Sequence, residues 1–307
     1  MKRVLFIGDI NVDVMMSGLE SLPVPDREVT CATFDTTMGS SAVICASVYA
    51  ALGGHAAMLG LVGTDDYGEF MMRGMRALGI DTRLVRRTDT VRTGVTVNLI
   101  HGRSRTQITY PGTITAFDGA DIDRATLWGF DHLHFAGPYL QTRFRPHIQR
   151  LLELAKEMHI STSLDPQWDS SQKWEWMAGW LPRLTWFFPN ADEAVSITHA
   201  PNSQEACALL ARQTPQPIVK AGKQGSFLWE NSRVMPVPMI DVPVVDTTGA
   251  GDAFDAGFLF ASLEQGMPLR EAARFATATA SRSCMFVGGV AAHSSVADVL
   301  QILGKYA

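Results

Sequence analysis

The chain has 307 residues, of which 46% are hydrophobic and 19% charged, and its formal net charge at pH 7 is −5. A chain of this length and composition buries a large core, which excludes an intrinsically disordered protein. The lack of a basic excess argues against nucleic acid or an anionic membrane as the main partner.

Short apolar runs alternate with longer helical patterns along the chain. The runs typical of buried strands cover residues 4–8, 56–63, 132–137, 160–165, 185–190 and 217–222. Helical patterns cover residues 39–54, 67–79 and 145–159, and the first two of these end on glycine. The alternation predicts an α/β fold with a mainly parallel central sheet and helices on both faces, and we expect a single domain over residues 1–307.

Two segments interrupt the alternation, at about residues 11–36 and 93–112. In the second, Val95, Val97 and Leu99 alternate with polar residues, and the turn sequence HGRSR leads into another β-rich run. We expect both segments to form strands of a small sheet. That sheet either covers a cleft as a lid or extends the edge of the main sheet.

Several predicted strands end on glycine or on a polar residue. These residues are Gly8 with Asp9, Gly63, Gly137, Asp165, Asn190 and Gly222. In open α/β sheets the ligand binds outside the carboxyl ends of the strands, so together they are expected to border one cleft. Ordinary turn preference explains any single one of them equally well.

The stretch DTTGAGDAFDAGF, from Asp246 to Phe258, carries the strongest functional signal. Gly249 and Gly251 let a ligand approach the main chain, and the apolar spacing predicts a helix that begins at Gly251 or Asp252. The free N–H groups of that helix form an anion site suited to phosphate. Asp252 would either interact with the helix dipole or act as a general base toward an attacking hydroxyl.

Competing motifs are absent or incomplete. The chain has no GxxxxGK[ST] sequence, and GAGDAF has phenylalanine where a dinucleotide fingerprint has its third glycine. His132 and His134 alternate on a predicted strand without further ligands, so we interpret them as structural. The four cysteines form no CxxC pair, and residues 1–13 lack the long apolar stretch of a signal peptide. We therefore expect a cytoplasmic protein with no membrane partner.

The stretch DTTGAGDAFDAGF resembles the C-terminal signature of the ribokinase/PfkB family of carbohydrate kinases. GDINVD, LVGTDDYGEF, SLDPQWD, PNADEA and VKAGKQGSF follow in the order that this family has, so the resemblance covers nearly the whole chain. It implies a three-layer ribokinase-like fold with a small β-sheet lid. It also implies an ATP- and Mg²⁺-dependent kinase, with K⁺ in some members, acting on a hydroxyl, normally an exocyclic hydroxymethyl, of a sugar or sugar-like substrate.

The resemblance implies a role for each matching residue. Asp252 would be the catalytic base, and the amides of Gly249, Ala250 and Gly251 would form the anion hole. The acceptor would contact Asn11, Asp13, Gly39, Ser40 and Asp165. The nucleotide side would comprise Asn190, Glu193, Lys220, Gly222, Gly225 and Thr248, with Glu193 acting on Mg²⁺ through water and Asp246 on a monovalent cation.

One motif departs from the family pattern. Met38 replaces the first of two glycines, and Val43 replaces an asparagine that contacts the sugar. Valine forms no hydrogen bond, so an acceptor contact is lost unless Ser40 or Ser41 supplies it, which argues against ribose itself as the substrate.

Two other functions remain open. One is a nucleoside kinase of the same family, and the other is a sugar-binding regulatory protein without turnover. The resemblance further implies a homodimer formed through the lid, whose exposed strand edges would be the physical reason.

Overall fold

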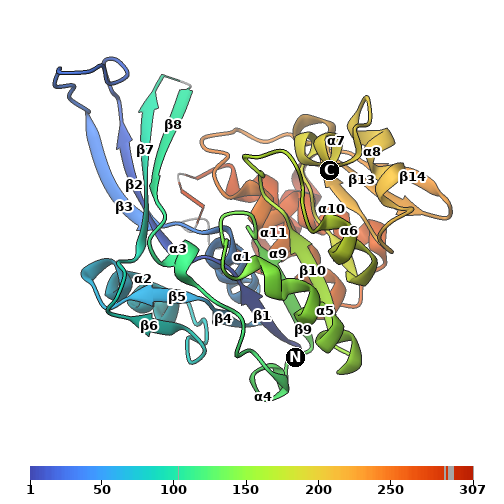
Figure 1. Ribbon diagram of the computed structural model, residues 1–307. Coiled ribbons are helices and arrows are strands. Elements are labelled where there is room, and N and C mark those ends of the chain that lie inside the picture. Colours follow the sequence, from blue (N-terminus) through green and yellow to red (C-terminus); the bar gives the residue numbers. More distant parts are fainter. Residues whose placement is uncertain (103, 287, 290–293, 307) are drawn as a thin grey trace.

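The central sheet contains five parallel strands in the order β11-β10-β9-β1-β4 (Figure 1). The computed structural model describes residues 1–102, 104–286, 288–289 and 294–306. The five strands are β1 (Arg3–Ile7), β4 (His55–Leu59), β9 (His132–Ala136), β10 (Ser161–Asp165) and β11 (Trp186–Phe187). Most of their side chains are buried, which explains the continuous apolar runs in the sequence.

Further strands continue beyond β11. Isolated bridges from Phe187 to Pro217 and from Asn190 to Lys220 align β12 (Ile218–Lys220) with this edge. β12 then pairs antiparallel with β13 (Ser226–Glu230), which pairs with β14 (Arg233–Val237).

The strand predicted over residues 56–63 is divided at Gly60. The chain passes so close to β1 there that a Cβ on Gly60 would lie 2.6 Å from the carbonyl oxygen of Gly8. Beyond this point β5 (Leu61–Gly63) pairs with β6 (Arg86–Thr88) in a separate two-stranded sheet.

The residues of β1 show how the sheet separates two layers of helices. Val4 and Phe6 belong to one hydrophobic cluster, and Leu5 and Ile7 belong to another. The helices of the first cluster are α1 (Ser41–Ala51), α2 (Asp66–Ala77), α9 (Ala250–Leu263), α10 (Leu269–Ser283) and α11 (Val296–Tyr306). Those of the second are α4 (Arg124–Leu127), α5 (Ile148–Glu157), α6 (Met177–Trp180), α7 (Ala191–Thr198) and α8 (Ser203–Leu210). The predicted three-layer α/β architecture is confirmed.

Four short helical turns complete the fold. They are α3 (Thr113–Ala116), η1 (Arg145–His147), η2 (Leu181–Arg183) and η3 (Gly222–Gln224). The helix predicted over residues 145–159 consists of η1 followed directly by α5.

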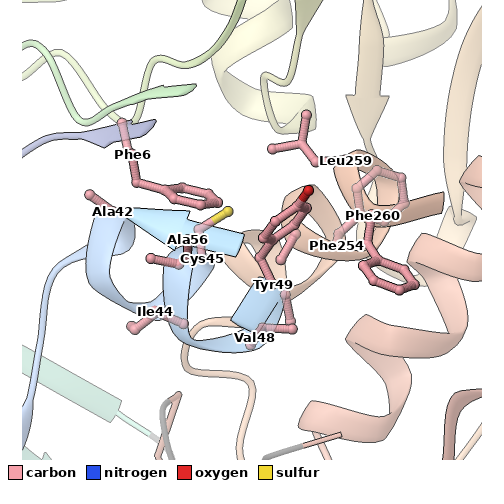
Figure 2. Close-up of a cluster of buried hydrophobic side chains, with 14 of the residues drawn as sticks. Phe6, Ala42, Ile44, Cys45, Val48, Tyr49, Ala56, Phe254, Leu259 and Phe260 are labelled. Atoms are coloured by element: carbon pink, nitrogen blue, oxygen red, sulfur yellow. The ribbon is translucent and has the colours of Figure 1, made fainter. Parts of the chain in front are cut away.

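The contact between α1 and α9 fixes the functional end of the molecule. Figure 2 shows part of the first cluster, in which Tyr49 on α1 lies against Phe260 on α9, with ring centroids 6.0 Å apart. Tyr49 also lies against Phe6 of β1, at 5.6 Å. The packing therefore sets the position of α9 relative to the carboxyl ends of the central strands.

The two inserted segments form one separate sheet that projects from the core (Figure 1). Its order is β3-β2-β7-β8, with β2 (Asn11–Ser17) parallel to β7 (Gly94–His101) and with β3 (Thr33–Met38) and β8 (Ser104–Tyr110) antiparallel to their neighbours. This confirms the predicted small sheet. The other expectation, an extension of the main sheet's edge, is wrong because the described residues of both segments pair with one another and with no strand of the central sheet.

This sheet of β3, β2, β7 and β8, called the lid sheet after its expected role, has one apolar face and one polar face. Val14 is aligned with Val97, which is aligned with Ile108, whereas Asp13 is aligned with Thr96 on the opposite face. Directly paired residues share a face, and the faces alternate along each strand. The polar face carries Asn11 and Asp13, two of the residues expected to contact the acceptor.

The buried histidines of β9 have partners in β10. His132 hydrogen-bonds Ser161 at 2.8 Å and Ser163 at 2.7 Å, and His134 hydrogen-bonds Ser163 at 2.8 Å. Burial lowers the pKa of His134 to about 4, so the ring is neutral. These contacts agree with the structural interpretation.

Within the described ranges, no helix combines the length and apolarity needed to cross a bilayer.

Candidate active site

The glycine turn forms the N-terminus of α9. The helix begins at Ala250, one residue before the predicted start, and Gly249 precedes it with a φ of 74°. A Cβ on Gly249 would lie 2.9 Å from Cα of Gly289 and 3.0 Å from Cγ2 of Ile44. Both the backbone conformation and the close packing therefore require glycine at this position. Among the described residues no side chain caps the helix, and although the Ala250 amide donates to the Thr247 carbonyl oxygen at 3.2 Å, the helix N-terminus presents its first turn to an anion.

A pocket of about 960 Å³ opens in front of this turn. Of the strand ends predicted to border one cleft, Asp165, Asn190 and Gly222 line this pocket. The others do not line it: Gly8, Asp9, Gly63 and Gly137. The residues of the turn that line it are Gly249, Ala250, Gly251 and Asp252. The strand ends and the α9 N-terminus therefore face the same space.

Part of the pocket wall is apolar. Ile240, Val242 and Val244 line it from the segment that follows β14, and Ala280 lines it from α10. Val244 is 61% exposed, although it is fully apolar. A planar, weakly polar ring would cover this surface and remove it from water.

Asp252 lies between the pocket and the core. It is buried, and its carboxylate hydrogen-bonds the side chain of Ser41 at the start of α1. Burial and the nearby charge of Asp165 raise the pKa of Asp252 well above its ordinary value, whereas Lys220 opposes this shift. A carboxylate with a raised pKa at an anion-binding turn suits a general base.

A buried ion cluster lies beside Asp252. Lys220 Nζ donates to Asp165 Oδ2 at 2.8 Å and to both carboxylate oxygens of Asp255 at 3.1 Å. Although burial favours the neutral acid, Lys220 holds the pKa of Asp165 below its ordinary value. Lys220 lines the pocket, but its three N–H groups are directed at carboxylate oxygens. The expectation that it binds the nucleotide therefore lacks a free donor in this structure.

Asn190 and Glu193 cap α7 reciprocally. Asn190 Oδ1 accepts from the Glu193 amide at 2.9 Å, and Glu193 Oε2 accepts from the Asn190 amide at 2.8 Å. Burial, together with the charge of Asp165, raises the pKa of Glu193 to about 7. Both residues line the pocket.

The donor set of this part of the pocket fits a hydrated Mg²⁺. Within the described ranges, no group of three or more His, Cys, Asp or Glu side chains is arranged to hold a metal directly. Mg²⁺ commonly binds through one or two carboxylates, several waters and substrate phosphates. Glu193 with the amide oxygen of Asn190 matches that arrangement.

The turn that contains Gly222 and Gly225 is close to β14. Gly225 has a φ of 82°, and a Cβ there would lie 2.0 Å from the Val237 carbonyl oxygen. Gly222 has a φ of 53° and open space around its Cα. Only Gly225 is therefore required by packing, whereas both glycines line the pocket.

The predicted acceptor residues form a second group below the lid. Asn11 Nδ2 donates to Asp13 Oδ1 at 3.2 Å, and a Cβ on Gly39 would lie 2.6 Å from the same oxygen. Burial raises the pKa of Asp13 to about 6, and Arg105 opposes this shift. Asn11, Asp13 and Gly39 do not line the 960 Å³ pocket, so the two groups are connected through Ser41 and Asp252.

The protein itself uses the hydroxyl of Ser40, which was expected to contact the acceptor. Ser40 Oγ donates to the carbonyl oxygen of Asp9 and accepts from the Val43 amide at 3.2 Å. Asp9 is buried, and burial raises the pKa of its carboxyl to about 7. Asp165, expected on the acceptor side as well, lines the pocket and pairs with Lys220.

Met38 and Val43, which depart from the family pattern, have roles in packing. A Cβ on Gly74 would lie 2.3 Å from Met38 Sδ, so Met38 fills the space above that glycine of α2. Val43 is fully buried in the first hydrophobic cluster. Neither serine beside Val43 clearly replaces the missing amide, because Ser40 caps α1 and Ser41 binds Asp252.

Asp246 and Thr248 shape the segment that leads into the glycine turn. Asp246 Oδ1 accepts from the amide and the hydroxyl of Thr248 at 2.9 and 2.8 Å, and Oδ2 accepts from the Gly288 amide at 2.9 Å. Burial opposes ionisation, but these bonds hold the pKa of Asp246 below its ordinary value. The protein therefore uses three of the roughly four acceptor positions of this carboxylate, and the monovalent-cation site at Asp246 stays a prediction.

Three functional candidates were missed in the sequence. Asp255 follows Asp252 by three residues, a spacing that places both on one face of a helix and could have indicated it. Arg105 on β8 donates from Nη1 to Thr248 Oγ1 at 3.1 Å, so it connects the lid to the glycine turn. Ser41 binds Asp252. No local pattern predicts the last two contacts, because each joins segments far apart in the chain.

The comparisons with known proteins agree with this geometry. The family model for pfkB family carbohydrate kinase matches residues 1–292. Ribokinase from Bacillus subtilis is 27% identical over 308 residues, covering 98% of this chain and all of that protein. Fructoselysine 6-kinase from Shigella flexneri is 29% identical over 234 residues, covering 74% of this chain and 82% of that protein. A putative ribokinase II from E. coli, crystallised in complex with ATP and Mg²⁺, covers both chains fully with a TM-score of 0.87 and 19% identity.

Proposed function

The chain belongs to the pfkB family of carbohydrate kinases, and on this premise we propose that it transfers the γ-phosphoryl group of ATP to a hydroxymethyl group of a sugar or sugar-like acceptor. The observation that carries the proposal is the uncapped N-terminus of α9, where Asp252 directly follows an anion-binding glycine turn. A binding protein without turnover has no need for a base at this point.

Asp252 takes the proton from the acceptor hydroxyl as that oxygen attacks the γ-phosphorus. The amides of Gly249, Ala250 and Gly251 stabilise the charge on the transferring group, because the turn and the start of α9 hold them at the wall of the pocket. The bond from phosphorus to the β,γ-bridging oxygen breaks, and ADP leaves. Asp252 then holds the proton until it returns to solvent.

The 960 Å³ pocket supports binding of ATP along its length. The adenine ring would cover Val242, Val244 and Ala280, and the phosphates would extend toward the glycine turn past Gly222 and Gly225. When bound, Mg²⁺ neutralises part of the phosphate charge, and Asn190 with Glu193 would hold it through water. A monovalent cation beside Asp246 would have to share that carboxylate with the Thr248 and Gly288 donors, and the mechanism above does not depend on it.

The acceptor would lie between the lid and the glycine turn. Asn11 and Asp13 face this space from the polar face of the lid sheet, and Gly39 leaves room beside them. Arg105 bridges from the lid to Thr248 and partly neutralises Asp13. A polyhydroxylated acceptor suits the amide and carboxylate groups on this face.

The apolar face of the lid supports a homodimer. Phe34 and Ile108 are 63% and 60% exposed there, and an exposed apolar sheet face of this kind commonly marks a protein interface.

All four cysteines are free, which suits the reducing cytoplasm in which we propose that the enzyme works.

The function is tested by measuring ADP formation from ATP and Mg²⁺ over a panel of acceptors. The panel contains pentoses, hexoses, amino sugars, sugar acids, sugar phosphates and nucleosides. We expect ADP formation that depends on one class of sugar-like acceptor, with the phosphorylated product identified by mass spectrometry. Turnover with nucleosides alone would support the nucleoside kinase instead, and ligand binding without any turnover would support a regulatory protein.

A further inference from the structure

The ion cluster beside Asp252 is too deeply buried for an ordinary stabilising salt bridge. The side chains of Lys220, Asp165 and Asp255 are 12%, 7% and 1% exposed. Buried ion pairs contribute little to stability, because the desolvation of the charges offsets their attraction. A chemical role therefore explains the cluster better than a structural one.

The geometry places the Lys220 ammonium next to the first turn of α9. A Cβ on Gly251 would lie 3.5 Å from Lys220 Nζ, so the charge is adjacent to the residue before Asp252. Three carboxylate oxygens, one from Asp165 and two from Asp255, lie within 3.1 Å of Nζ and use its three hydrogens. The ammonium therefore acts through its charge, not through a bond to phosphate.

We propose that Lys220 is a positioning residue for the base: it cancels the charge of Asp165 and so keeps the Asp252 carboxylate ionised and able to accept the acceptor's proton. This inference rests on the proposed function, in which Asp252 is the general base. Asp255 holds the ammonium between the strand end and α9. Lys220 belongs to this proton chemistry and makes no contact with the nucleotide.

The groups around Asp252 explain why such a cation is needed. Carboxyl groups interact with it from β10, from the segment after β1 and from α9 itself, whereas α1 contributes a hydroxyl and a thiol. In the described part of the chain these groups are Asp165, Asp9, Asp255, Ser41 and Cys45, and Glu193 of α7 lines the same pocket. Lys220 is the cation that opposes the raised pKa of Asp252.

The experiment compares the pH dependence of kcat, at saturating ATP, Mg²⁺ and acceptor, in four proteins. Lys220→Gln removes the charge and keeps hydrogen bonding, Lys220→Arg keeps the charge, and Lys223→Met removes a lysine of the same pocket that lies outside the cluster. In the profile of kcat against pH, we expect the fall on the acid side (the acid limb) to lie about one pH unit or more higher in Lys220→Gln than in the wild type. At a fixed pH below the limb, this shift corresponds to about a tenfold lower rate. The rate should recover as the pH rises. Lys220→Arg and Lys223→Met should keep the wild-type limb.

The double variant Asp165→Asn/Lys220→Gln keeps the test decisive if Lys220→Gln folds poorly. It removes the cation together with the Asp165 charge that the cation cancels. Burial raises the pKa of the remaining Asp255 carboxyl well above its ordinary value, so that carboxyl is protonated once Lys220 is gone. We therefore expect the acid limb of the double variant to return toward that of the wild type. The same comparison in a Glu193→Gln background excludes titration of that second carboxyl as the source of the shift.

A loss of rate in Lys220→Gln that is equal at every pH would overturn the inference, because it would indicate a structural or phosphate-binding role. The Asp252→Asn variant separates the two levels of the proposal. If it keeps turnover, the base assignment itself is wrong. If it is inactive at every pH while Lys220→Gln keeps the wild-type limb, only the role of Lys220 is wrong.

Discussion

The central sheet and the lid sheet contribute different halves of the same site. The central strands are buried on both faces, and the end of β10, with β12 and α9, holds Asp165, Lys220 and Asp252 within the packed core. The lid is polar on one face only and presents Asp13 and Arg105 from a sheet that projects outward (Figure 1). We infer that the core fixes the chemistry, whereas the lid selects and encloses the acceptor. Changes in the core should therefore alter kcat, and changes in the lid should alter KM for the acceptor.

The largest combined effect on stability and rate is expected from Gly249→Ala, in the core half. The substitution forces a φ of 74° on alanine and brings its Cβ to 2.9 Å from Gly289, so it should lower the free energy of unfolding by about 1–3 kcal/mol and kcat by about 10²-fold or more. Thermal denaturation and steady-state kinetics measure the two losses. Gly251→Ala is the matched control, because its nearest contact is 3.5 Å away and it should lose rate without losing stability. Equal stability of the two variants would contradict the account of the turn.

Asp13→Ala tests the lid half of the comparison. A charged hydrogen bond to the acceptor contributes about 1.5–3 kcal/mol, so kcat/KM for the acceptor should fall by roughly 10- to 150-fold, while KM for ATP stays unchanged. Varying each substrate at saturation of the other measures both values. An equal loss for ATP and acceptor would place Asp13 outside the acceptor site.

Arg105→Ala should have a smaller effect that depends on pH. Loss of the guanidinium removes the bond to Thr248 and an attraction that lowers the pKa of Asp13, so that pKa should rise above its value of about 6. If acceptor binding requires ionised Asp13, KM for the acceptor should increase by about three- to tenfold near pH 6 and less at pH 8, since the ionised form is restored as pH rises. Arg27→Ala, on the loop between β2 and β3, is the control. A pH-independent change would mean that Arg105 does not act through Asp13.

The smallest effect on turnover is expected from Ile108→Asp on the outer face of the lid. A charge in an apolar interface is costly to bury, so the variant should shift the protein from dimer to monomer. Size-exclusion chromatography with light scattering measures the mass. An unchanged mass, or a monomeric wild type, would remove the proposed dimer without affecting the assignment of the active site.

The same contrast explains what could be predicted from the sequence. Apolar runs and glycine-terminated helices gave the layers of the core, and the alternation of Val95, Val97 and Leu99 gave the lid, because both patterns depend on local periodicity. The glycine turn and Asp252 are contiguous in the chain and were therefore predictable. The bond from Arg105 to Thr248 spans 143 residues, and the strand break at Gly60 depends on the approach of Gly8, so neither has a local signal.

The acceptor side was harder to predict for a related reason. Ser40 was expected to contact the acceptor, yet its hydroxyl caps α1, and Val43 was expected near the sugar, yet it packs in the core. A motif gives the position of a residue in the chain, whereas the use of its side chain depends on neighbours from other segments. In the lid and in α1, such tertiary contacts determine what each side chain does.

The most direct test of the central claim is the rate of phosphoryl transfer by Asp252→Asn, compared with its affinity for ATP. The amide keeps the shape of the carboxylate and cannot accept the proton. We predict that kcat falls by about 10² to 10⁴, with the Kd for ATP, measured by calorimetry, changed by less than about threefold. Turnover close to that of the wild type, with ATP binding intact, would contradict the assignment of Asp252 as the base and with it the proposed mechanism.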